Sequence, residues 1–338
     1  MPPIPDELLY EHAERVRNKV VFITGAATGI GKVTATRFAA HGAHVIIADM
    51  NLPAAEQTAR ELRASGGRIF ALKCDVTIWE DVLAAYEFAI EKFGVVDIVI
   101  ANAGIGESAM LGGDLEVDSD GKFVKPSTKT VDVNLIGVLY TVHLAQHYLL
   151  INCHDQTSLK AVVILGSIAS WWALRAAQYT ATKFAVLGLM RSLDPSFTEK
   201  GIRIAAIHPW FADTDIVPYS YKLGMAGIPL VPVPRVAGAI FYAASSPDPS
   251  TSGSSYWCHP GPVFRIPREE FKLGVYKMID EQANAMFDLK DATAIQLTLK
   301  TWQDLAKLYW RPAWNKAMLF GTLGIVLAWR YRKLLSIS

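Results

Sequence analysis

Short apolar runs recur along the chain, and segments with helical spacing separate them. Five runs lack the polar alternation of a half-exposed strand, which is typical of strands buried on both faces of a sheet. They are Val20–Thr24, Val45–Asp49, Ile98–Asn102, Val162–Gly166 and Ile204–His208. Helical spacing is found in Thr34–Ala40, Pro53–Ala64, Trp79–Phe93 and Val131–Leu149. Strands that alternate with helices predict an α/β fold, with a doubly wound parallel sheet in a Rossmann-type three-layer sandwich.

The same pattern divides the chain into three parts. Residues 1–17 precede the first strand, and Asp6–Arg17 is expected to form a short helix. Residues 18–267 carry the alternating pattern and form the expected Rossmann-type domain. After Pro267 the strand–helix rhythm stops, which predicts a helical C-terminal extension over residues 268–338.

Two irregular segments interrupt the domain. Leu111–Lys129 is polar and is expected to be a loop, with a hairpin turning at Asp120–Gly121. Val217–Arg235 contains four prolines among many apolar residues, a composition that favours a loop covering a binding site.

The C-terminal extension contains an uncharged run of 13 residues, Ala317–Trp329, with cations on both sides of it. A spanning helix needs about 20 residues, so the run is short for a transmembrane segment. Flanking tryptophans and cations are typical of a helix at a membrane interface. Residues 310–333 are therefore a candidate membrane interface, and the alternative is a buried helix that completes an oligomer interface.

Composition narrows the class of protein. Of the 338 residues 51% are hydrophobic and 19% charged, which favours a globular protein with a large core. The 33 basic residues nearly match the 32 acidic ones, which argues against nucleic acid as a partner. Three separated cysteines predict neither a disulfide framework nor a zinc site, and the first residues lack a secretory core. A cytoplasmic small-molecule enzyme is the expectation.

Glycines at positions 25, 29 and 31 follow the first strand, in Thr24–Gly31. At this point in the fold, glycines let the backbone turn tightly and approach a pyrophosphate at the helix N-terminus. The alternative is an ordinary tight turn between strand and helix. Asp49 ends the second strand, where a carboxylate accepts both ribose hydroxyls of NAD and repels the 2′-phosphate of NADP. Met50 and Asn51 are uncharged, so NAD is expected rather than NADP, although an acid at a strand end can also simply cap a helix.

Tyr179 and Lys183 are four positions apart in a segment with helical spacing, so both lie on one helix face. A free phenol has a pKa of about 10, too high for a general base at neutral pH. A nearby ammonium and the positive nicotinamide of bound NAD favour the phenolate. The pair is a candidate acid–base catalyst, although an isolated pair of this kind would usually be ordinary helix surface.

Seven motifs support the catalytic interpretation of this pair. They are TGAATGIG (Thr24–Gly31), CDVT (Cys74–Thr77), ANAG (Ala101–Gly104), VDVNLIG (Val131–Gly137), GSIAS (Gly166–Ser170), YTATK (Tyr179–Lys183) and HPWFADT (His208–Thr214). In their order and spacing they resemble the short-chain dehydrogenase/reductase family over about residues 18–260. The chain is similar to a typical NAD-dependent member. Gly253–Pro267 loosely resembles the hydroxyprostaglandin-dehydrogenase-like branch.

The resemblance implies a role for each matching residue. Tyr179 would accept the alcohol proton, Ser167 would position the substrate oxygen, and Lys183 would lower the tyrosine pKa and hold the nicotinamide ribose. Asn134 would organise a proton relay through water. The implied cofactor contacts are Gly25, Thr28, Gly29, Ile30, Gly31, Asp49, Asp75, Val76, Asn102, Ala103, Gly104, Tyr179, Lys183 and Thr214.

The chain departs from the family pattern near the substrate. Trp210 stands where the family usually has glycine, and Ser167 and Tyr179 are 12 positions apart without the proline often found between them. Trp171, Trp172 and Trp210 form a candidate substrate wall, and for the first two the alternative is packing in the core. Such a wall favours a lipid, steroid or polyketide-like molecule.

These observations predict an enzyme that oxidises a hydrophobic secondary alcohol to a ketone with NAD. The alternatives are an NADPH-dependent ketone reductase and a membrane-tethered nucleotide-binding scaffold without turnover. His143 and His147 are four apart and have the spacing of metal ligands, but the sequence suggests no third ligand and no metal is expected. The resemblance also implies a homodimer or homotetramer.

Overall fold

The computed structural model describes residues 3–64, 67–152, 158–214, 216 and 229–269. Contacts divide the chain into two units, Met1–Glu270 and Phe271–Ser338. The predictions for the C-terminal extension, including the candidate membrane interface over residues 310–333, fall outside the described residues. Among the helices that are described, none is both long and apolar enough to cross a membrane.

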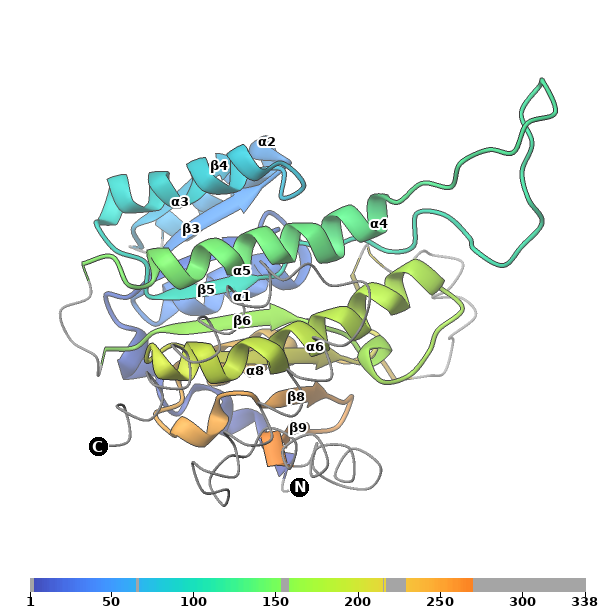
Figure 1. Ribbon diagram of the computed structural model, residues 1–338. Helices are drawn as coiled ribbons and strands as arrows, with labels where there is room; N and C mark the ends of the chain where they lie inside the picture. Colours follow the sequence, from blue (N-terminus) through green and yellow to red (C-terminus); the bar gives the residue numbers. More distant parts are fainter. Residues whose placement is uncertain (1–2, 65–66, 153–157, 215, 217–228, 270–338) are drawn as a thin grey trace, which may run out of the picture. The chain divides into compact units, whose positions relative to one another are not determined.

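Nine strands form one sheet in the order β1-β9-β8-β7-β6-β5-β2-β3-β4 (Figure 1). They are β1 (Pro3–Ile4), β2 (Val20–Thr24), β3 (His44–Asp49), β4 (Ile69–Lys73), β5 (Ile98–Ala101), β6 (Ala161–Leu165), β7 (Arg203–Pro209), β8 (Ser255–Cys258) and β9 (Val263–Ile266). The strands from β4 across to β8 are parallel, whereas β9 runs antiparallel to both β8 and β1.

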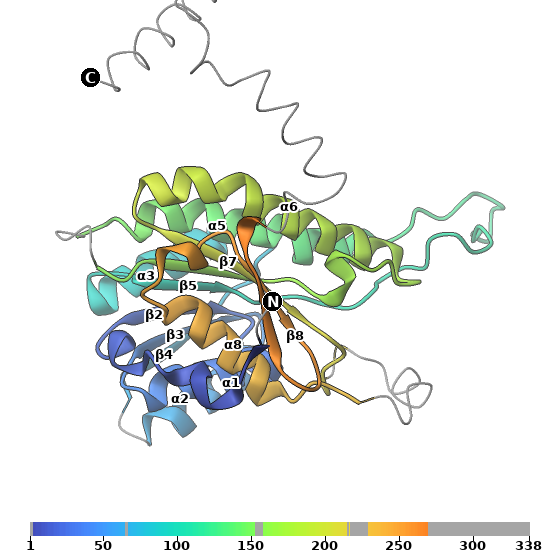
Figure 2. The same ribbon diagram turned by 90° about the horizontal axis from the view of Figure 1, so that it is seen from below.

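Helices cover both faces of this sheet. Figure 2 shows α1 (Gly29–Ala40), α2 (Leu52–Arg63) and α8 (Val233–Ser245) on one side, and α3 (Trp79–Phe93), α5 (Gly137–Tyr148) and α6 (Ala177–Glu199) on the other. Because every residue of β2, β5 and β6 is buried, the central strands have the continuous apolar runs seen in the sequence. The predicted doubly wound three-layer fold is confirmed.

The strand order reverses between β2 and β5, which pair in parallel with Val21 opposite Ile98. From β2 the chain proceeds outward through β3 and β4, and from β5 it proceeds outward through β6 and β7. In open parallel sheets the loops diverge at such a point and leave a crevice at the carboxyl ends of the strands. The fold therefore brings the segments that follow β2, β5, β6 and β7 to one edge.

The prediction of one short helix over Asp6–Arg17 is wrong. Two 3-10 helices take its place, Asp6–Tyr10 and Ala13–Val16, and His12 between them has non-helical backbone angles. Tertiary packing overrides helix propensity here, because Leu9 is buried against α8 and Asp6 pairs with Arg235 at 2.7 Å. The leader also adds β1 to the sheet edge.

Other elements also differ from the prediction, and β8 and β9 were not predicted as strands. Helix α1 begins at Gly29, five residues before the predicted start. The predicted helix Val131–Leu149 consists of α4 (Lys129–Val131), a π-helical turn (Asp132–Ile136) and α5. Strand β4 was not predicted because its burial alternates, as expected for a strand at the sheet edge.

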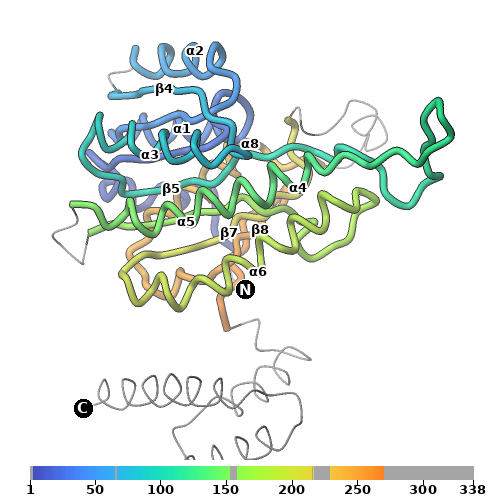
Figure 3. Tube along the Cα trace, turned by 45° about the horizontal axis from the view of Figure 1, so that its top comes forward, coloured from blue at the N-terminus to red at the C-terminus, as the bar shows by residue number. Residues whose placement is uncertain are grey.

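The hairpin predicted at Asp120–Gly121 is confirmed. Val117 and Phe123 form an antiparallel bridge, and Gly121 takes the positive φ of +73° that the turn requires. In Figures 1 and 3 this segment, which begins after β5 and returns at α4, projects from the body as a long arm.

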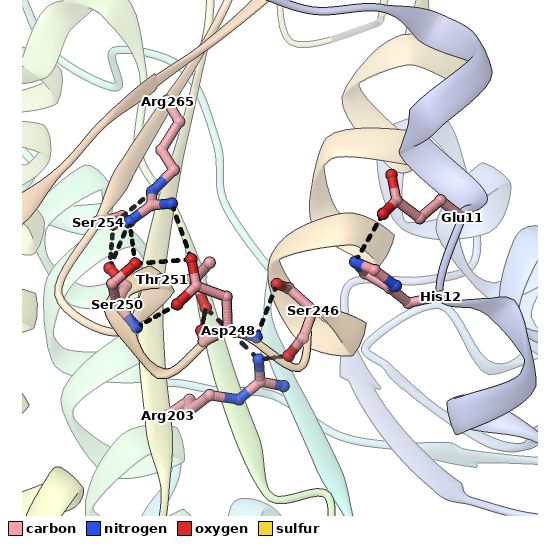
Figure 4. Close-up of polar contacts among 9 residues, drawn as sticks. All are labelled: Glu11, His12, Arg203, Ser246, Asp248, Ser250, Thr251, Ser254 and Arg265. Carbon is pink, nitrogen blue, oxygen red and sulfur yellow. Dashed lines mark hydrogen bonds and ion pairs between the residues drawn. The ribbon is translucent and has the colours of Figure 1, made fainter. Parts of the chain in front are cut away.

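Two arginines close the end of the domain after α8 (Figure 4). Arg265 on β9 donates to the Ser250 carbonyl at 2.6 Å and pairs with Asp248 at 3.3 Å. Arg203 on β7 donates to the carbonyls of Ala244 and Ser246 at the end of α8. The Arg203 guanidinium thus satisfies carbonyls that the end of α8 leaves without intrahelical donors, and Arg265 binds the 3-10 turn that follows.

Candidate active site

The glycine-rich turn after β2 has no room for a side chain at Gly25 or Gly31. Gly25 has a φ of +64°, and a Cβ at this position would come 2.7 Å from the Cα of Ala103. A Cβ on Gly31 would collide with the Gly25 carbonyl oxygen and lie 2.6 Å from Nδ2 of Asn102. Thr28 and Gly29 at the start of α1 are exposed, so the helix N-terminus faces outward as a pyrophosphate site requires.

Asn102 fastens this turn to the end of β5. Its side-chain amide donates to the carbonyls of Thr24 at 3.0 Å and Gly25 at 2.7 Å. The Thr24 hydroxyl accepts from the backbone of Asn102 and Ala103 at 3.1 and 3.2 Å, a role that sequence reasoning missed. Asn102 Oδ1 is buried and has no hydrogen-bond partner among the described residues, which leaves it as an acceptor beside the turn. This cradle of backbone and amide groups fits a dinucleotide.

We expect Gly31→Ala to weaken both folding and cofactor binding. The added methyl has no space, because the carbonyl of Gly25 and the amide of Asn102 occupy it. Overpacking of this kind costs about 1–3 kcal/mol in the free energy of unfolding. Denaturant titration measures that loss, and calorimetry with NADH should show a matching loss of affinity. Gly188→Ala on α6, where a Cβ meets nothing within 4 Å, is the matched control.

Asp49 at the end of β3 has its carboxylate fixed by two backbone groups. Oδ2 accepts from the N–H of Ala27 in the glycine turn at 2.9 Å, and Oδ1 accepts from Asn51 at 2.9 Å. Each oxygen keeps a lone pair for a further donor. The cation that follows the turn, Lys32, pairs with Glu61 at 2.8 Å. The carboxylate is therefore held beside the turn with its charge unneutralised by Lys32.

The motif after β4 is also tightly held. Asp75 Oδ1 accepts from the backbone and hydroxyl of Thr77 at 3.0 and 2.8 Å, and the Asp75 N–H donates to Asp81. Val76 is 6% exposed and packs closely on Gly137, because a Cβ added to Gly137 would lie 2.6 Å from Cγ2 of Val76. Thr214 lies near the start of α1, 3.9 Å from where a Cβ on Gly29 would be.

The four candidate catalytic residues come from three neighbouring segments. Ser167 follows β6 and caps a 3-10 turn, Tyr179 and Lys183 lie in the first two turns of α6, and Asn134 is in the π-helical turn. The Ser167 side chain lies close enough to the Tyr179 phenol to lower its pKa, and the Lys183 ammonium lies 5.5 Å from the centre of the Tyr179 ring. The structure thus brings Ser167, Tyr179 and Lys183 together.

Asn134 uses both ends of its amide on one backbone residue. Oδ1 accepts from the N–H of Ile105 and Nδ2 donates to its carbonyl, both at 2.8 Å. Asn134 is fully buried. The π-helical turn, a local feature often associated with functional sites, directs this side chain to the segment that follows β5.

Burial dominates the electrostatics of the tyrosine and lysine. Burial raises the pKa of Tyr179, and the hydrogen bond from Ser167 acts in the opposite direction. Burial lowers the pKa of Lys183 to about 8, and its ammonium donates to the Leu165 carbonyl at 2.8 Å. In the protein alone, burial therefore has the largest effect on the Tyr179 pKa.

His208 at the end of β7 belongs to the motif HPWFADT, which by itself implies no role for it. It is fully buried, its Nδ1 lies 3.2 Å from the Ser167 carbonyl, and the Trp171 ring covers it at 4.1 Å between centroids. A Cβ on Gly166 would lie 2.5 Å from Nδ1. With a carbonyl as its partner, Nδ1 carries the proton, and the imidazole supports the backbone of Ser167. In the sequence, the available sign of this contact was a histidine directly before Pro209.

We expect stability to fall at acid pH because of His208. Burial lowers the pKa of His208 to about 3 in the folded protein. In the unfolded chain the imidazole is protonated below a pKa of about 6.5. The free energy of unfolding therefore falls by up to about 1.4 kcal/mol for each pH unit between about pH 6.5 and about pH 3. Denaturant titrations at several pH values measure the slope of the unfolding free energy against pH. In His208→Phe this slope should correspond to one proton fewer taken up on unfolding. Equal slopes in both proteins would contradict the assignment.

The three candidate wall tryptophans divide into two groups. Trp171 packs on His208, which favours the core alternative for that residue. Trp172 is 54% exposed and stacks on Trp210, with centroids 5.9 Å apart and planes within 4°. Trp210 also packs against the hydrophobic core. The loop that was expected to cover the site lies largely outside the described residues.

His143 and His147 are both exposed on α5. His143 contacts Gln146 and Trp79, and His147 contacts Tyr148. Within the part of the chain that the structure describes, His, Cys, Asp and Glu side chains form no group of three that could hold a metal ion.

Comparison with known proteins identifies the family. A family model described as short chain dehydrogenase matches residues 19–222. Cyclohexanol dehydrogenase of Acinetobacter sp. strain SE19 is 32% identical over 252 residues, which cover 72% of this chain and 94% of that protein. The 5'-hydroxyaverantin dehydrogenase of Dothistroma septosporum is 32% identical, over 60% of this chain and 70% of its own. The 3beta-hydroxysteroid dehydrogenase 2 of Eggerthella lenta is 31% identical, over 61% and 75%.

A solved structure shares the fold. It is that of 3-ketoacyl-(acyl-carrier-protein) reductase from Brucella melitensis complexed with NADH, with a TM-score of 0.62 and 27% identity, covering 72% of this chain and 97% of that one. The chain therefore belongs to the short-chain dehydrogenase/reductase family and is an oxidoreductase acting on CH–OH groups.

Proposed function

We propose that this enzyme oxidises a hydrophobic secondary alcohol to a ketone with NAD as the acceptor. The observation that carries the proposal is the grouping of three side chains at the edge of the sheet where the glycine turn lies: the Ser167 side chain lowers the pKa of Tyr179, and buried Lys183 has its ammonium 5.5 Å from the Tyr179 ring. Two hydroxyl groups side by side suit an alcohol oxygen, since one can donate to it while the other accepts its proton.

In this proposal Ser167 holds the substrate oxygen and Tyr179 takes its proton. Bound oxidised nicotinamide supplies the acceptor for the hydride that leaves the carbinol carbon. The positive charges of Lys183 and of the ring would both favour the phenolate, opposing the burial that raises the Tyr179 pKa. Lys183, which lies one turn below the phenol, would also donate to the ribose. Asn134 holds Ile105 and with it the segment lining the site.

NAD is the proposed cofactor because of Asp49. Its carboxylate is fixed by Ala27 and Asn51, and each oxygen can accept a ribose hydroxyl. A 2′-phosphate would lie against this charge, with Lys32 already paired to Glu61. Calorimetric titration of the enzyme with NADH and NADPH tests the choice, and tighter binding of NADPH would favour the alternative, an NADPH-dependent ketone reductase.

The proposed substrates are bulky, apolar secondary alcohols. The stacked pair of Trp172 and Trp210 offers a flat aromatic surface, and Trp172 is exposed enough to contact a ligand. Relatives named for cyclohexanol, 5'-hydroxyaverantin and 3beta-hydroxysteroids support this class. A homodimer or homotetramer remains the expectation, which light scattering would measure.

A further inference from the structure

The catalytic helix α6 begins without a cap of its own. Ala176 at the N-cap position has no side chain that could accept a hydrogen bond from the first turn. The first backbone N–H groups of a helix need acceptors from elsewhere. In α6 the second and third residues of the helix are Gln178 and Tyr179, so the acceptor for their N–H groups also sets the position of the tyrosine backbone.

Glu107 supplies that acceptor from the segment after β5. Its Oε1 accepts from the N–H of Gln178 at 3.1 Å, and its Oε2 accepts from the N–H of Tyr179 at 2.7 Å. The carboxylate therefore binds two adjacent N–H groups at once, across a separation of more than 70 residues in sequence. Bonds of this kind to an ionised group are shorter and stronger than neutral ones.

The segment that carries Glu107 is itself held on both sides. Asn134 binds the backbone of Ile105 through two hydrogen bonds. The Ser108 and Thr130 hydroxyls bond to each other at 2.8 Å and each accepts from the backbone of the other residue. A carboxylate between two such fixed points can locate a helix start accurately.

A third contact comes from the same helix turn. The buried side chain of Gln178 donates to the Ser127 carbonyl at 2.8 Å, on the returning leg of the arm. The start of α6 is thus bound to both legs of the arm, through Glu107 on one and Ser127 on the other. The two hydrogen bonds of Glu107 are made to backbone N–H groups, so Glu107 acts on Tyr179 through its backbone.

We propose that Glu107 is a positioning residue that fixes the Tyr179 phenol relative to Ser167 and connects it, through Ile105, to Asn134. The inference rests on the proposed function, because it assigns Glu107 a role in the step that Tyr179 performs. A misplacement of a reacting group by about 1 Å can cost 100-fold in rate, so a partial loss of this support is expected to cost about 10-fold.

The experiment compares Glu107→Ala, Glu107→Gln and Asp248→Asn with the wild type. Glutamine keeps the length and one acceptor oxygen but loses the charge. Asp248 is the matched control, since its carboxylate also accepts a backbone N–H at a helix start, from Ser250, at a place remote from Tyr179. Turnover with a secondary alcohol is expressed per NADH-binding site, which removes the effect of unfolded protein. The primary deuterium isotope effect on kcat is measured with alcohol deuterated at the carbinol carbon.

We expect kcat to fall about 10-fold in Glu107→Ala and less in Glu107→Gln, with a larger isotope effect and an NADH affinity within about twofold of wild type. Asp248→Asn should leave kcat and the isotope effect unchanged. Normal kcat per NADH site in Glu107→Ala, or a fall without any rise in the isotope effect, would overturn the inference. Tyr179→Phe separates the two proposals: if it keeps turnover the proposed function fails, and if only Glu107→Ala keeps turnover the positioning role alone fails.

Discussion

Replacing Tyr179 by phenylalanine is expected to lower kcat for alcohol oxidation by about 1,000-fold, within the range typical of a lost general base. The variant keeps the aromatic ring, which is partly buried, and removes only the hydroxyl, whose pKa the Ser167 side chain lowers. The Lys183 ammonium keeps its bond to the Leu165 carbonyl, so the local structure should persist. NADH affinity should change little, because the backbone of the glycine turn is not touched. Initial rates and calorimetry measure the two quantities.

Tyr242→Phe on α8 is the matched control for this experiment. It removes a phenol hydroxyl from a tyrosine that packs near His12 and Tyr256, on elements other than α6. Its turnover should equal that of the wild type. Turnover of Tyr179→Phe within a few-fold of wild type would remove Tyr179 from the chemistry, whatever its surroundings.

Asp49→Asn is expected to reduce the preference for NAD over NADP by about 100-fold in kcat/KM. The carboxylate lies beside the glycine turn, where a 2′-phosphate would meet a like charge, and such a juxtaposition costs several kcal/mol. Asparagine keeps one acceptor oxygen for the N–H groups of Ala27 or Asn51 and removes the charge. The measurement is kcat/KM for each cofactor at saturating alcohol.

Asp120→Asn at the exposed tip of the arm removes the same charge far from the glycine turn and controls for net charge. It should leave the preference unchanged. An unaltered preference in Asp49→Asn would mean that other groups select the cofactor.

Much of the fold was predictable because the central strands are buried on both faces. In β2 and β6 every residue is buried, and both runs were identified from apolar content alone. Strand β4, with alternating burial at the sheet edge, and β1, two residues paired with β9, gave no such pattern. The N-terminal segment was predicted as a helix because local spacing cannot reveal that Leu9 and Asp6 dock on α8.

At the site, motif spacing predicted the residues whose identity the proposed chemistry requires. It did not find those that act through contacts between distant segments. Glu107 reaches Tyr179 only because the segment after β5 lies beside α6, and His208 lies under Ser167 only because β6 and β7 pair. The direction of the Tyr179 pKa shift could not be predicted from the sequence either, since it depends on burial in the folded protein.

The most direct test of the proposed activity is the initial rate of NAD reduction by the wild-type enzyme with a panel of hydrophobic secondary alcohols, followed by the absorbance of NADH. The panel includes cyclohexanol, a 3β-hydroxysteroid and a polycyclic aromatic alcohol, each paired with a primary alcohol of similar size, and the product is identified as the ketone. We predict one ketone formed per NADH with at least one secondary alcohol, and slower turnover with NADP. Binding of NAD without oxidation of any member would contradict the proposal and favour the scaffold alternative.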